Sequence, residues 1–527
     1  HLPGRSVLLS QFTINDPYYA TLLRISGRSA QAVFFSVYIW NHTFIRRLIN
    51  DLTRLRPDLP LILGGPQAPA LGELPEQCTL FLGEIEGAPK AFYQDLEQDR
   101  LQALYRAERA QTFPCPYRQE DFRNALKNRQ LYYESSRGCP FSCSYCLSSG
   151  SGGVRHKPID LVKKELLGLI AAKPMIIKFV DRTFNDQPER ALILWQFLIE
   201  SAESVRFHFE ISPDRFTEPM FDLLATVPCD QFQFEIGIQS FHEPTLAAVK
   251  RRMDIEAACC NIQRLLALDS IHLHLDLILG LPSESEVSFR YSFNQVFRLA
   301  PHYIQLGLLK VLPGTEIARR AEEFGLIFCN EPPYEILATR WLDHKQLSEL
   351  HELCECTESF YNNRFFRSLW QYMLQTGEEP FAFFAELLRL CREYDFFRLS
   401  RTHKLMTRIL TDLLRQRKDQ KILLELLRYD WLRCGHRNLP EYLTETSQSE
   451  LRNHLRNQLP QNLKDLFSYQ TRVEFLKQAS FITLSQETLQ FLGLSRQSHR
   501  KRGIVALLPE QTDGVMKFHR AVLLPRV

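Results

Sequence analysis

The chain has 527 residues, and its composition of 45% hydrophobic and 24% charged residues is typical of a folded globular protein rather than a disordered one. The length exceeds what one hydrophobic core supports, so we expect two to four domains. A net charge of +3 is near balance and gives no ground for a general attraction to nucleic acid or membranes. We find no long apolar run, no signal-peptide pattern and an odd number of cysteines at irregular spacing, which favours a cytoplasmic protein with reduced thiols.

Residues 1–97 are predicted to form a Rossmann-like α/β domain. Apolar, strand-like runs occur at 6–14, 30–40 and 59–65, and residues 44–57 between the last two have helical spacing. Strands that alternate with helices imply a parallel, doubly wound sheet. The chain begins with His1 rather than Met, so we expect this domain to be truncated at its start. Residues 98–130 are polar and rich in Gln and Arg, and they are predicted to be a linker.

Residues 131–335 are predicted to form a partial (β/α)6 barrel of the TIM type. Short apolar runs recur at 131–136, 175–180, 205–211, 231–239, 272–281 and 303–312, with helix-patterned segments between them. In parallel barrels the chemistry lies at the C-terminal ends of the strands. We therefore expect functional residues just after each run.

Residues 336–527 are predicted to form a mainly helical C-terminal region that ends in a small β unit. Helical, aromatic-rich patterns extend to about residue 470, and strand-like runs follow. Cys354 and Cys356, two apart on a predicted helix, point to different faces and are poor co-ligands. The basic cluster at 495–503 is either a solvated loop or a nucleic-acid-binding patch.

Three cysteines, Cys139, Cys143 and Cys146, occur within eight positions directly after the first predicted barrel strand. A structural zinc site closes four Cys or His ligands around the metal, and the nearest later histidine is His156. Three thiolates instead suit a cubane iron–sulfur cluster with one iron left open for a substrate or cofactor. Three buried structural cysteines are the alternative.

The spacing C-x3-C-x2-C, with the aromatic Tyr145 before the last cysteine, resembles the signature of the radical S-adenosylmethionine superfamily. The resemblance implies that the cysteines hold a [4Fe–4S] cluster whose open iron chelates S-adenosylmethionine. It also implies a reductase such as flavodoxin or ferredoxin as a partner, and a 5′-deoxyadenosyl radical as the reactive species. By the same resemblance, the residues that contact S-adenosylmethionine are Asp181, Glu210, Gln239 and Arg251, the last beside Arg252.

Three segments of the first domain resemble the cobalamin-binding domain that precedes the barrel in one large branch of this superfamily: "VFFSVYIWN", "LPLILGGP" and "LFLGEIEGAPKAF". Glycines at strand ends suit close approach of the backbone to a ligand. The alternative is a flavodoxin-like domain in which the Gly-Gly-Pro is only a turn. The implied cobalamin-binding residues are Ser36, Val37, Tyr38, Gly64, Gly65, Pro66, Gly83 and Glu84.

Residues 336–527 resemble the uncharacterised C-terminal extension of a subgroup of these cobalamin-linked enzymes. The whole resemblance implies a methyltransferase in which one S-adenosylmethionine methylates cobalamin and a second forms the radical that activates the substrate. The substrate is not identified and could be a small molecule, a peptide or RNA. The alternatives are a ring-forming or rearranging radical enzyme, an RNA- or tRNA-modifying enzyme, and a cobalamin-binding sensor or carrier.

Overall fold

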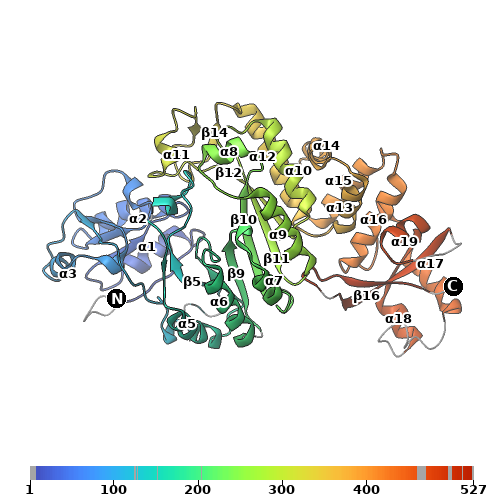
Figure 1. Cartoon of the computed structure of the whole chain (residues 1–527), viewed down its shortest axis with the longest axis horizontal. Helices are drawn as coiled ribbons and strands as arrows, with labels where there is room; N and C mark the ends of the chain where they lie inside the picture. The colour runs from blue at the N-terminus through green and yellow to red at the C-terminus, as the bar shows by residue number, and fades with distance from the viewer. Residues whose placement is uncertain are drawn as a thin grey trace.

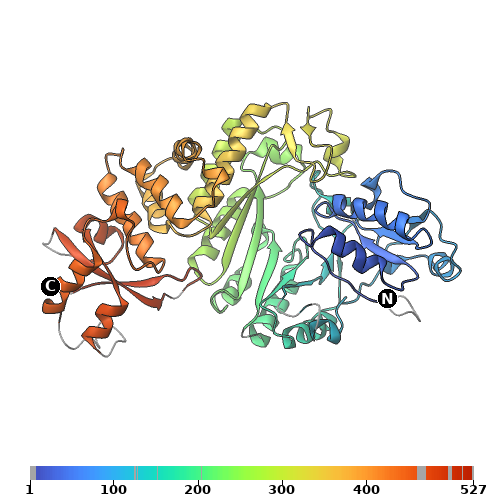
Figure 2. The same cartoon turned by 180° about the vertical axis from the view of Figure 1, so that it is seen from behind.

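The computed structural model describes residues 7–123, 126, 129–150, 152–202, 204–459, 471–495, 501–512 and 514–524. The first domain and the terminal β unit lie at opposite ends of an elongated molecule, with the barrel between them (Figure 1 and, from behind, Figure 2). None of the helices in these ranges has the length and apolar character needed to cross a bilayer.

The first domain is a parallel α/β unit with helices on both faces of its sheet. Its strands are β1 (Val33–Ser36), β2 (Leu61–Gly64), β3 (Cys78–Leu82) and β4 (Leu104–Arg106), hydrogen-bonded in that order within the described residues. Leu61 and Leu63 pack against α1 (Tyr18–Ser26) and α2 (His42–Leu55). Ile62 points the other way, toward α3 (Lys90–Glu97), because successive side chains of a strand alternate between faces.

Two details of this domain differ from expectation. Residues 7–14 form no strand, and Val7 and Leu8 are 48% and 65% exposed. The segment expected to be a linker, 98–130, contributes β4, which pairs with β3. This strand is only three residues long in a polar context, and it is fixed by Tyr105, whose hydroxyl donates to Asp95 over 2.7 Å while its ring packs on Phe92.

The second domain contains a six-stranded parallel sheet within the described residues, which is the parallel α/β arrangement that the sequence predicts. This sheet and its helices are the barrel domain. The strand order follows the chain from one edge to the other: β5 (Leu131–Tyr133), β8 (Ile176–Phe179), β9 (Arg206–Ile211), β10 (Phe232–Gln239), β11 (His272–Leu279) and β12 (Tyr303–Leu308). The covering helices are α5 (Ile159–Ala171), α6 (Pro188–Ser201), α7 (Glu218–Leu224), α8 (Glu243–Ala248), α9 (Ile255–Ala267), α10 (Glu286–Leu299) and α11 (Glu316–Arg319).

Barrel strands β9 to β11 alternate between buried apolar and partly buried polar residues. The apolar side chains, among them Phe209, Phe234 and Leu275, belong to the main hydrophobic core. The polar side chains therefore face the lumen, which leaves the interior of this barrel hydrophilic.

Two short antiparallel hairpins interrupt the barrel pattern. One, β6 (Ser136–Arg137) with β7 (Arg155–His156), brackets the cysteine loop. The other, β13 (Ile327–Phe328) with β14 (Ile336–Ala338), follows the last barrel strand.

The C-terminal region is helical before its final sheet, as predicted. Its helices are α12 (His344–Tyr361), α13 (Arg367–Thr376), α14 (Pro380–Glu393), α15 (His403–Leu414), α16 (Gln420–Arg433), α17 (Gln448–Gln458), α18 (Arg472–Gln478) and α19 (Gln486–Phe491). Strands β15 (Ser480–Ser485), β16 (Arg502–Gln511) and β17 (His519–Leu523) form an antiparallel sheet. Most of the basic cluster, residues 496–500, lies outside the described residues.

Candidate functional site: the cysteine loop and the strand ends that face it

The cysteine loop lies at the carboxyl end of the barrel because two backbone hydrogen bonds tie it there. The Ser144 N–H donates to the Val249 carbonyl, and the Ile317 N–H donates to the Ser144 carbonyl, each over 2.9 Å. Val249 follows α8 and Ile317 lies in α11, so the loop is fixed to the segments that follow β10 and β12. Ser144 itself is fully buried.

The three thiols have different surroundings. Cys143 is buried, and Arg251 Nη1 lies 3.7 Å from its Sγ. Cys139 is half-buried, with its Sγ 3.8 Å from Thr183 Oγ1, and burial raises the pKa of its thiol. Among the described residues, the three cysteine Sγ atoms do not all lie within 4.8 Å of one another, which is the spacing of side chains that could surround a single ion. A wider spacing fits a cluster, which distributes its ligands over several iron atoms.

Arg251, rather than the exposed Arg252, is the arginine that reaches the cysteines. Its guanidinium also donates to the carbonyl of Gly237 in β10. The side chain of Gln239 folds back over the same glycine, and a Cβ on Gly237 would lie 2.1 Å from Gln239 Nε2. Two of the residues expected to contact S-adenosylmethionine therefore meet at the end of β10. Tyr145 lies beside Arg251, and burial raises the pKa of its hydroxyl.

Asp181 has a different environment from the one expected for a ligand contact. Its side chain is buried, and it accepts hydrogen bonds from the Ser135 N–H over 2.9 Å and from the Ser135 and Ser136 hydroxyls over 2.6 and 2.7 Å. Burial raises its pKa to about 6. These bonds anchor the chain just ahead of the cysteine loop, and the geometry favours that structural role. Contact with S-adenosylmethionine stays a prediction.

Glu210 lies near the rim of the barrel, because it is the next-to-last residue of β9. Its Oε1 lies 3.4 Å from Arg182 Nη1 on the neighbouring loop. Burial raises its pKa to about 7 despite this ion pair, and the nearby Glu235 and Asp276 carboxylates act in the same direction. Its carboxyl group is therefore poised to change charge near neutral pH.

In the first domain, the loop after β2 packs directly on the loop after β1. The Val37 N–H donates to the Gly64 carbonyl over 2.7 Å, and the Gln67 N–H donates to the Val37 carbonyl over 3.1 Å. Gly65 has a φ of +99°, and a Cβ there would lie 2.6 Å from the Val37 oxygen. Ser36 ends β1, and Pro66 continues the Gly-Gly turn. Gly65 is thus required by the contact between the two loops, whereas a Cβ on Gly64 would make only an ordinary contact, 3.8 Å from the Phe81 carbonyl oxygen.

Tyr38 presents an aromatic surface beside this turn. Its ring stacks on Trp40 with centroids 4.5 Å apart and an interplanar angle of 6°, and Trp40 is 63% exposed. Gln67, between the turn and the barrel, is fully buried and accepts from the Tyr334 hydroxyl over 3.2 Å. Its Nε2 has no hydrogen-bond partner in the described structure.

Glu84 lies between the first domain and the cysteine loop. It follows β3 and Gly83, which has a φ of +96°, and it forms ion pairs with Arg137 over 3.1 Å and with Arg155. Arg137 and Arg155 bracket the cysteines in the β6–β7 hairpin. The side chain expected in the cobalamin pocket therefore contacts the barrel, and it brings the carboxyl edge of the first sheet close to the cysteine loop.

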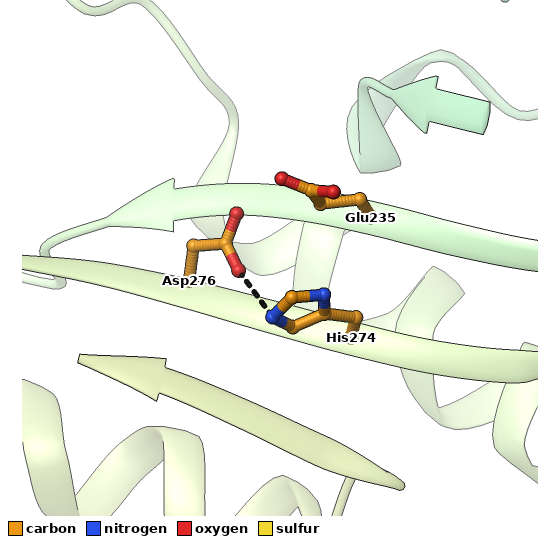
Figure 3. A group of neighbouring side chains, drawn as sticks. All are labelled: Glu235, His274 and Asp276. Carbon is orange, nitrogen blue, oxygen red and sulfur yellow. Dashed lines mark ion pairs between the residues drawn. The ribbon is translucent and has the colours of Figure 1, made fainter. Parts of the chain in front are cut away.

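Sequence reasoning missed a group of polar residues inside the barrel, shown in Figure 3: Glu235, His274 and Asp276. The alternation in "QFQFEIGIQ" and "HLHLDLILGL" could have indicated them, since every second residue of each strand is polar or glycine around these positions. It also missed Ser135, Ser136 and Thr183, for which no motif exists.

An open parallel barrel with a three-cysteine loop after its first strand defines a radical S-adenosylmethionine enzyme domain. The family comparison agrees: residues 133–296 match the radical SAM superfamily, so the chain contains a radical SAM domain. A domain of this kind uses a [4Fe–4S] cluster and S-adenosylmethionine. Residues 322–491 match a second family, described as a protein of unknown function, DUF4080, and this match overlaps most of the predicted C-terminal extension, 336–527.

Curated relatives share the central part of the chain. The chain is 23% identical over 293 residues to a tRNA-2-methylthio-N(6)-dimethylallyladenosine synthase of Psychrobacter cryohalolentis, a match that covers 52% of this chain and 59% of that protein. It is also 23% identical over 287 residues to a bacteriochlorophyllide d C-12(1)-methyltransferase of Chlorobaculum tepidum, covering 51% and 60%. The chain thus spans about 60% of the length of these two relatives.

The fold is similar to that of a solved structure, the cobalamin-dependent S-adenosylmethionine radical enzyme OxsB with aqua-cobalamin and S-adenosylmethionine bound. That likeness has a TM-score of 0.53 at 14% identity and covers 91% of this chain and 77% of the other. At this identity the likeness shows the fold alone.

Proposed function

We propose that the chain is a cobalamin-dependent radical S-adenosylmethionine methyltransferase. The observation that carries the proposal is the pair of ionic contacts from Glu84 to Arg137 and Arg155. Ligands of open α/β sheets bind at the carboxyl ends of the strands, and barrel chemistry occurs at the same ends of its strands. Because Glu84 joins these two edges, cofactors bound at each would face one space.

Cys139, Cys143 and Cys146 would hold the cluster. The guanidinium of Arg251, 3.7 Å from Cys143 Sγ, would place a positive charge beside one of the sulfur ligands of the cluster. When bound, the cluster supplies the electron that cleaves S-adenosylmethionine. The Gln239 side chain would hold the cofactor at the end of β10, where it folds over Gly237.

The first domain offers a surface suited to cobalamin. The exposed Tyr38–Trp40 stack provides a flat aromatic face, and the unpaired Nε2 of Gln67 provides a buried donor beside the Gly-Gly turn. When bound, cobalamin would carry a methyl group from S-adenosylmethionine to the substrate. The chain's own contribution is to fix that carrier opposite the barrel mouth.

The test is product analysis with methyl-deuterated S-adenosylmethionine. Anaerobically reconstituted protein, supplied with cobalamin, a reductant and metabolite extract, should form both S-adenosylhomocysteine and 5′-deoxyadenosine, and a product that carries the whole CD3 group. A ring-forming or rearranging enzyme would form 5′-deoxyadenosine without S-adenosylhomocysteine. If a substrate is converted to product and 5′-deoxyadenosine forms without S-adenosylhomocysteine, the methyltransferase assignment would be overturned.

An RNA substrate is the second candidate, because one of the curated relatives is named as a tRNA-modifying synthase. RNA that co-purifies with the protein, and binding that weakens steeply with salt, would support it. The discriminating measurement is the same isotope experiment with total tRNA in place of the metabolite extract.

We further propose a cytoplasmic location and an external reductase of the flavodoxin or ferredoxin type. All thirteen cysteines lie in the described ranges and are free thiols, as expected in a reducing compartment. The exposed rim around the half-buried Cys139 and Cys146 is where an electron donor would approach. Turnover with a physiological flavodoxin instead of dithionite would test this partner.

A further inference from the structure

The lumen of the barrel concentrates carboxylates on neighbouring strands. In the parallel register, Glu235 of β10 lies opposite Glu210 of β9 on one side and His274 of β11 on the other. Asp276 is the next lumen-facing residue of β11 after His274. Because parallel strands are about 4.8 Å apart, these side chains are forced close together.

Three of these side chains converge on one point. The ligand atoms of Glu235, His274 and Asp276 all lie within 4.8 Å of one another, and Figure 3 shows the three groups directed toward a common space. His274 Nε2 and Asp276 Oδ1 are 3.0 Å apart. Both atoms are shielded from solvent, and neither has a hydrogen bond of acceptable geometry among the described residues.

The 3.0 Å separation between His274 Nε2 and Asp276 Oδ1 is expected for an ion pair and also for two ligands of one metal ion. Two ligands that each lie about 2.1 Å from one metal ion and subtend a right angle are about 3.0 Å apart. Two buried polar atoms at that separation, without an aligned N–H between them, match the arrangement of two ligands of one metal ion.

Neighbouring residues hold the ligands in place. His208 Nε2 lies 3.0 Å from Glu235 Oε2, and the ring of Tyr303 meets the His274 ring edge to face, with centroids 4.4 Å apart. Metal ligands in proteins are oriented by such outer contacts. Lys178, in register with His208 on β8, is the further cation that faces this group from the sheet, and Glu358 of α12 adds another carboxylate near His274.

We propose that Glu235, His274 and Asp276 bind one divalent transition-metal ion in the barrel lumen. One imidazole and two carboxylates suit Mn²⁺, Fe²⁺ or Zn²⁺. Three protein ligands leave coordination positions open, which an oxygen donor of the substrate would occupy. Glu235 precedes Gln239 by four residues of β10, and Asp276 is in register with Gly237, two residues before Gln239, so the ion lies about 7–13 Å along the strand from the rim. This anchoring role rests on the proposed function, whereas binding of the ion does not.

The test uses full-length, cluster-reconstituted protein titrated anaerobically with Mn²⁺, with the free ion followed by its electron paramagnetic resonance signal. We expect one site per chain, and competition by Zn²⁺. Asp276→Asn and Glu235→Gln, which keep side-chain size, should each weaken Mn²⁺ binding at least tenfold. The matched control is Glu256→Gln, an exposed carboxylate at the start of α9, which should leave binding unchanged.

His208→Ala removes only the outer contact to Glu235 and should weaken binding by about tenfold. Iron and sulfide content, with 5′-deoxyadenosine formation from S-adenosylmethionine alone, reports separately on the cluster in every variant. Wild-type protein that takes up no Mn²⁺ or Zn²⁺ while its cluster is intact would overturn the proposal and leave the radical chemistry standing. Undiminished binding by both Asp276→Asn and Glu235→Gln would also overturn it.

Discussion

Asn362 pairs with both backbone groups of Ile304 on the free edge of the barrel. The Ile304 N–H donates to Asn362 Oδ1 over 2.9 Å, and Asn362 Nδ2 donates to the Ile304 carbonyl over 2.7 Å. Two residues along β12, the Leu306 N–H donates to Glu358 Oε1 over 2.6 Å. Side chains from α12 and the residue that follows it thus replace a neighbouring strand, and the C-terminal region covers the open flank of the barrel.

This edge contact predicts a stability effect. Asn362→Ala leaves the Ile304 N–H and carbonyl without their partner, which should lower the free energy of unfolding by about 1–3 kcal/mol. Asn438→Ala, at an exposed position, is the control and should be neutral within about 0.5 kcal/mol. Chemical denaturation of both variants measures the difference. If Asn362→Ala and Asn438→Ala were equally stable, water would be forming the hydrogen bonds of the Ile304 N–H and carbonyl in place of Asn362.

The cysteine loop predicts which thiols carry the cluster. Cys139→Ala, Cys143→Ala and Cys146→Ala should each abolish the broad brown absorbance and the cleavage of S-adenosylmethionine. Cys229→Ala and Cys434→Ala are controls, since Cys229 is exposed and the Cys434 thiol donates to the Phe365 carbonyl in the C-terminal region over 3.9 Å. Iron and sulfide analysis after anaerobic reconstitution checks the outcome. Tetrahedral zinc in place of iron in the wild-type protein would contradict the assignment.

Gly65 and Gly72 separate a steric effect from a backbone effect in the first domain. Both have positive φ, +99° and +83°, but a Cβ on Gly65 would clash with Val37 and one on Gly72 meets nothing within 4 Å. Gly72 has a ψ of −148°, a backbone region that essentially only glycine adopts, so Gly72→Ala should cost about 1–3 kcal/mol through backbone strain without a clash. Gly65→Ala should displace the loop after β1 and abolish retention of cobalamin through gel filtration, with the iron content unchanged. Stoichiometric cobalamin in the Gly65→Ala protein would place the pocket elsewhere.

Glu284 predicts a pH dependence of stability. It is fully buried, it accepts from the Ser240 hydroxyl over 3.0 Å, and burial raises its pKa from 4.5 to about 8. The folded state therefore keeps a proton that the unfolded chain loses above pH 4.5, so the stability from this group falls as pH rises toward 8. The slope is about 1.4 kcal/mol per pH unit within that window.

Glu284→Gln keeps the neutral form permanently and should remove this slope. The variant should resemble the wild type near pH 5 and exceed its stability at pH 8.5. Urea denaturation at several pH values measures both curves, and Glu256→Gln is the exposed control. Parallel curves for the wild type and Glu284→Gln would show that Glu284 is ionised in the folded protein.

The sequence by itself determined the class of the protein. The six barrel strands were predictable because each is an apolar run of ordinary length bounded by helix-patterned segments, and the cysteine spacing is a local signal that needs no partner. The helical C-terminal region and the final sheet were predictable as well, because their apolar residues recur at the spacing of a helix or a strand over many positions. Local periodicity is set by the backbone geometry of helices and strands, so it is readable along the chain.

Tertiary structure decided what the polar side chains do. Strand β4 has three residues, and it exists because β3 offers a free edge and Tyr105 a bond to Asp95. Asp181 anchors the loop ahead of the cysteines, and Glu84 joins two domains, because residues more than 40 positions away supply their partners. The lumen group of Glu235, His274 and Asp276 depends on the register of two strands, which the alternation in either strand alone does not specify. A carboxylate at a strand end can cap a helix, form an ion pair or bind a ligand. Which of these it does depends on the partners that long-range pairing brings to it, and those partners are fixed only when the chain is folded.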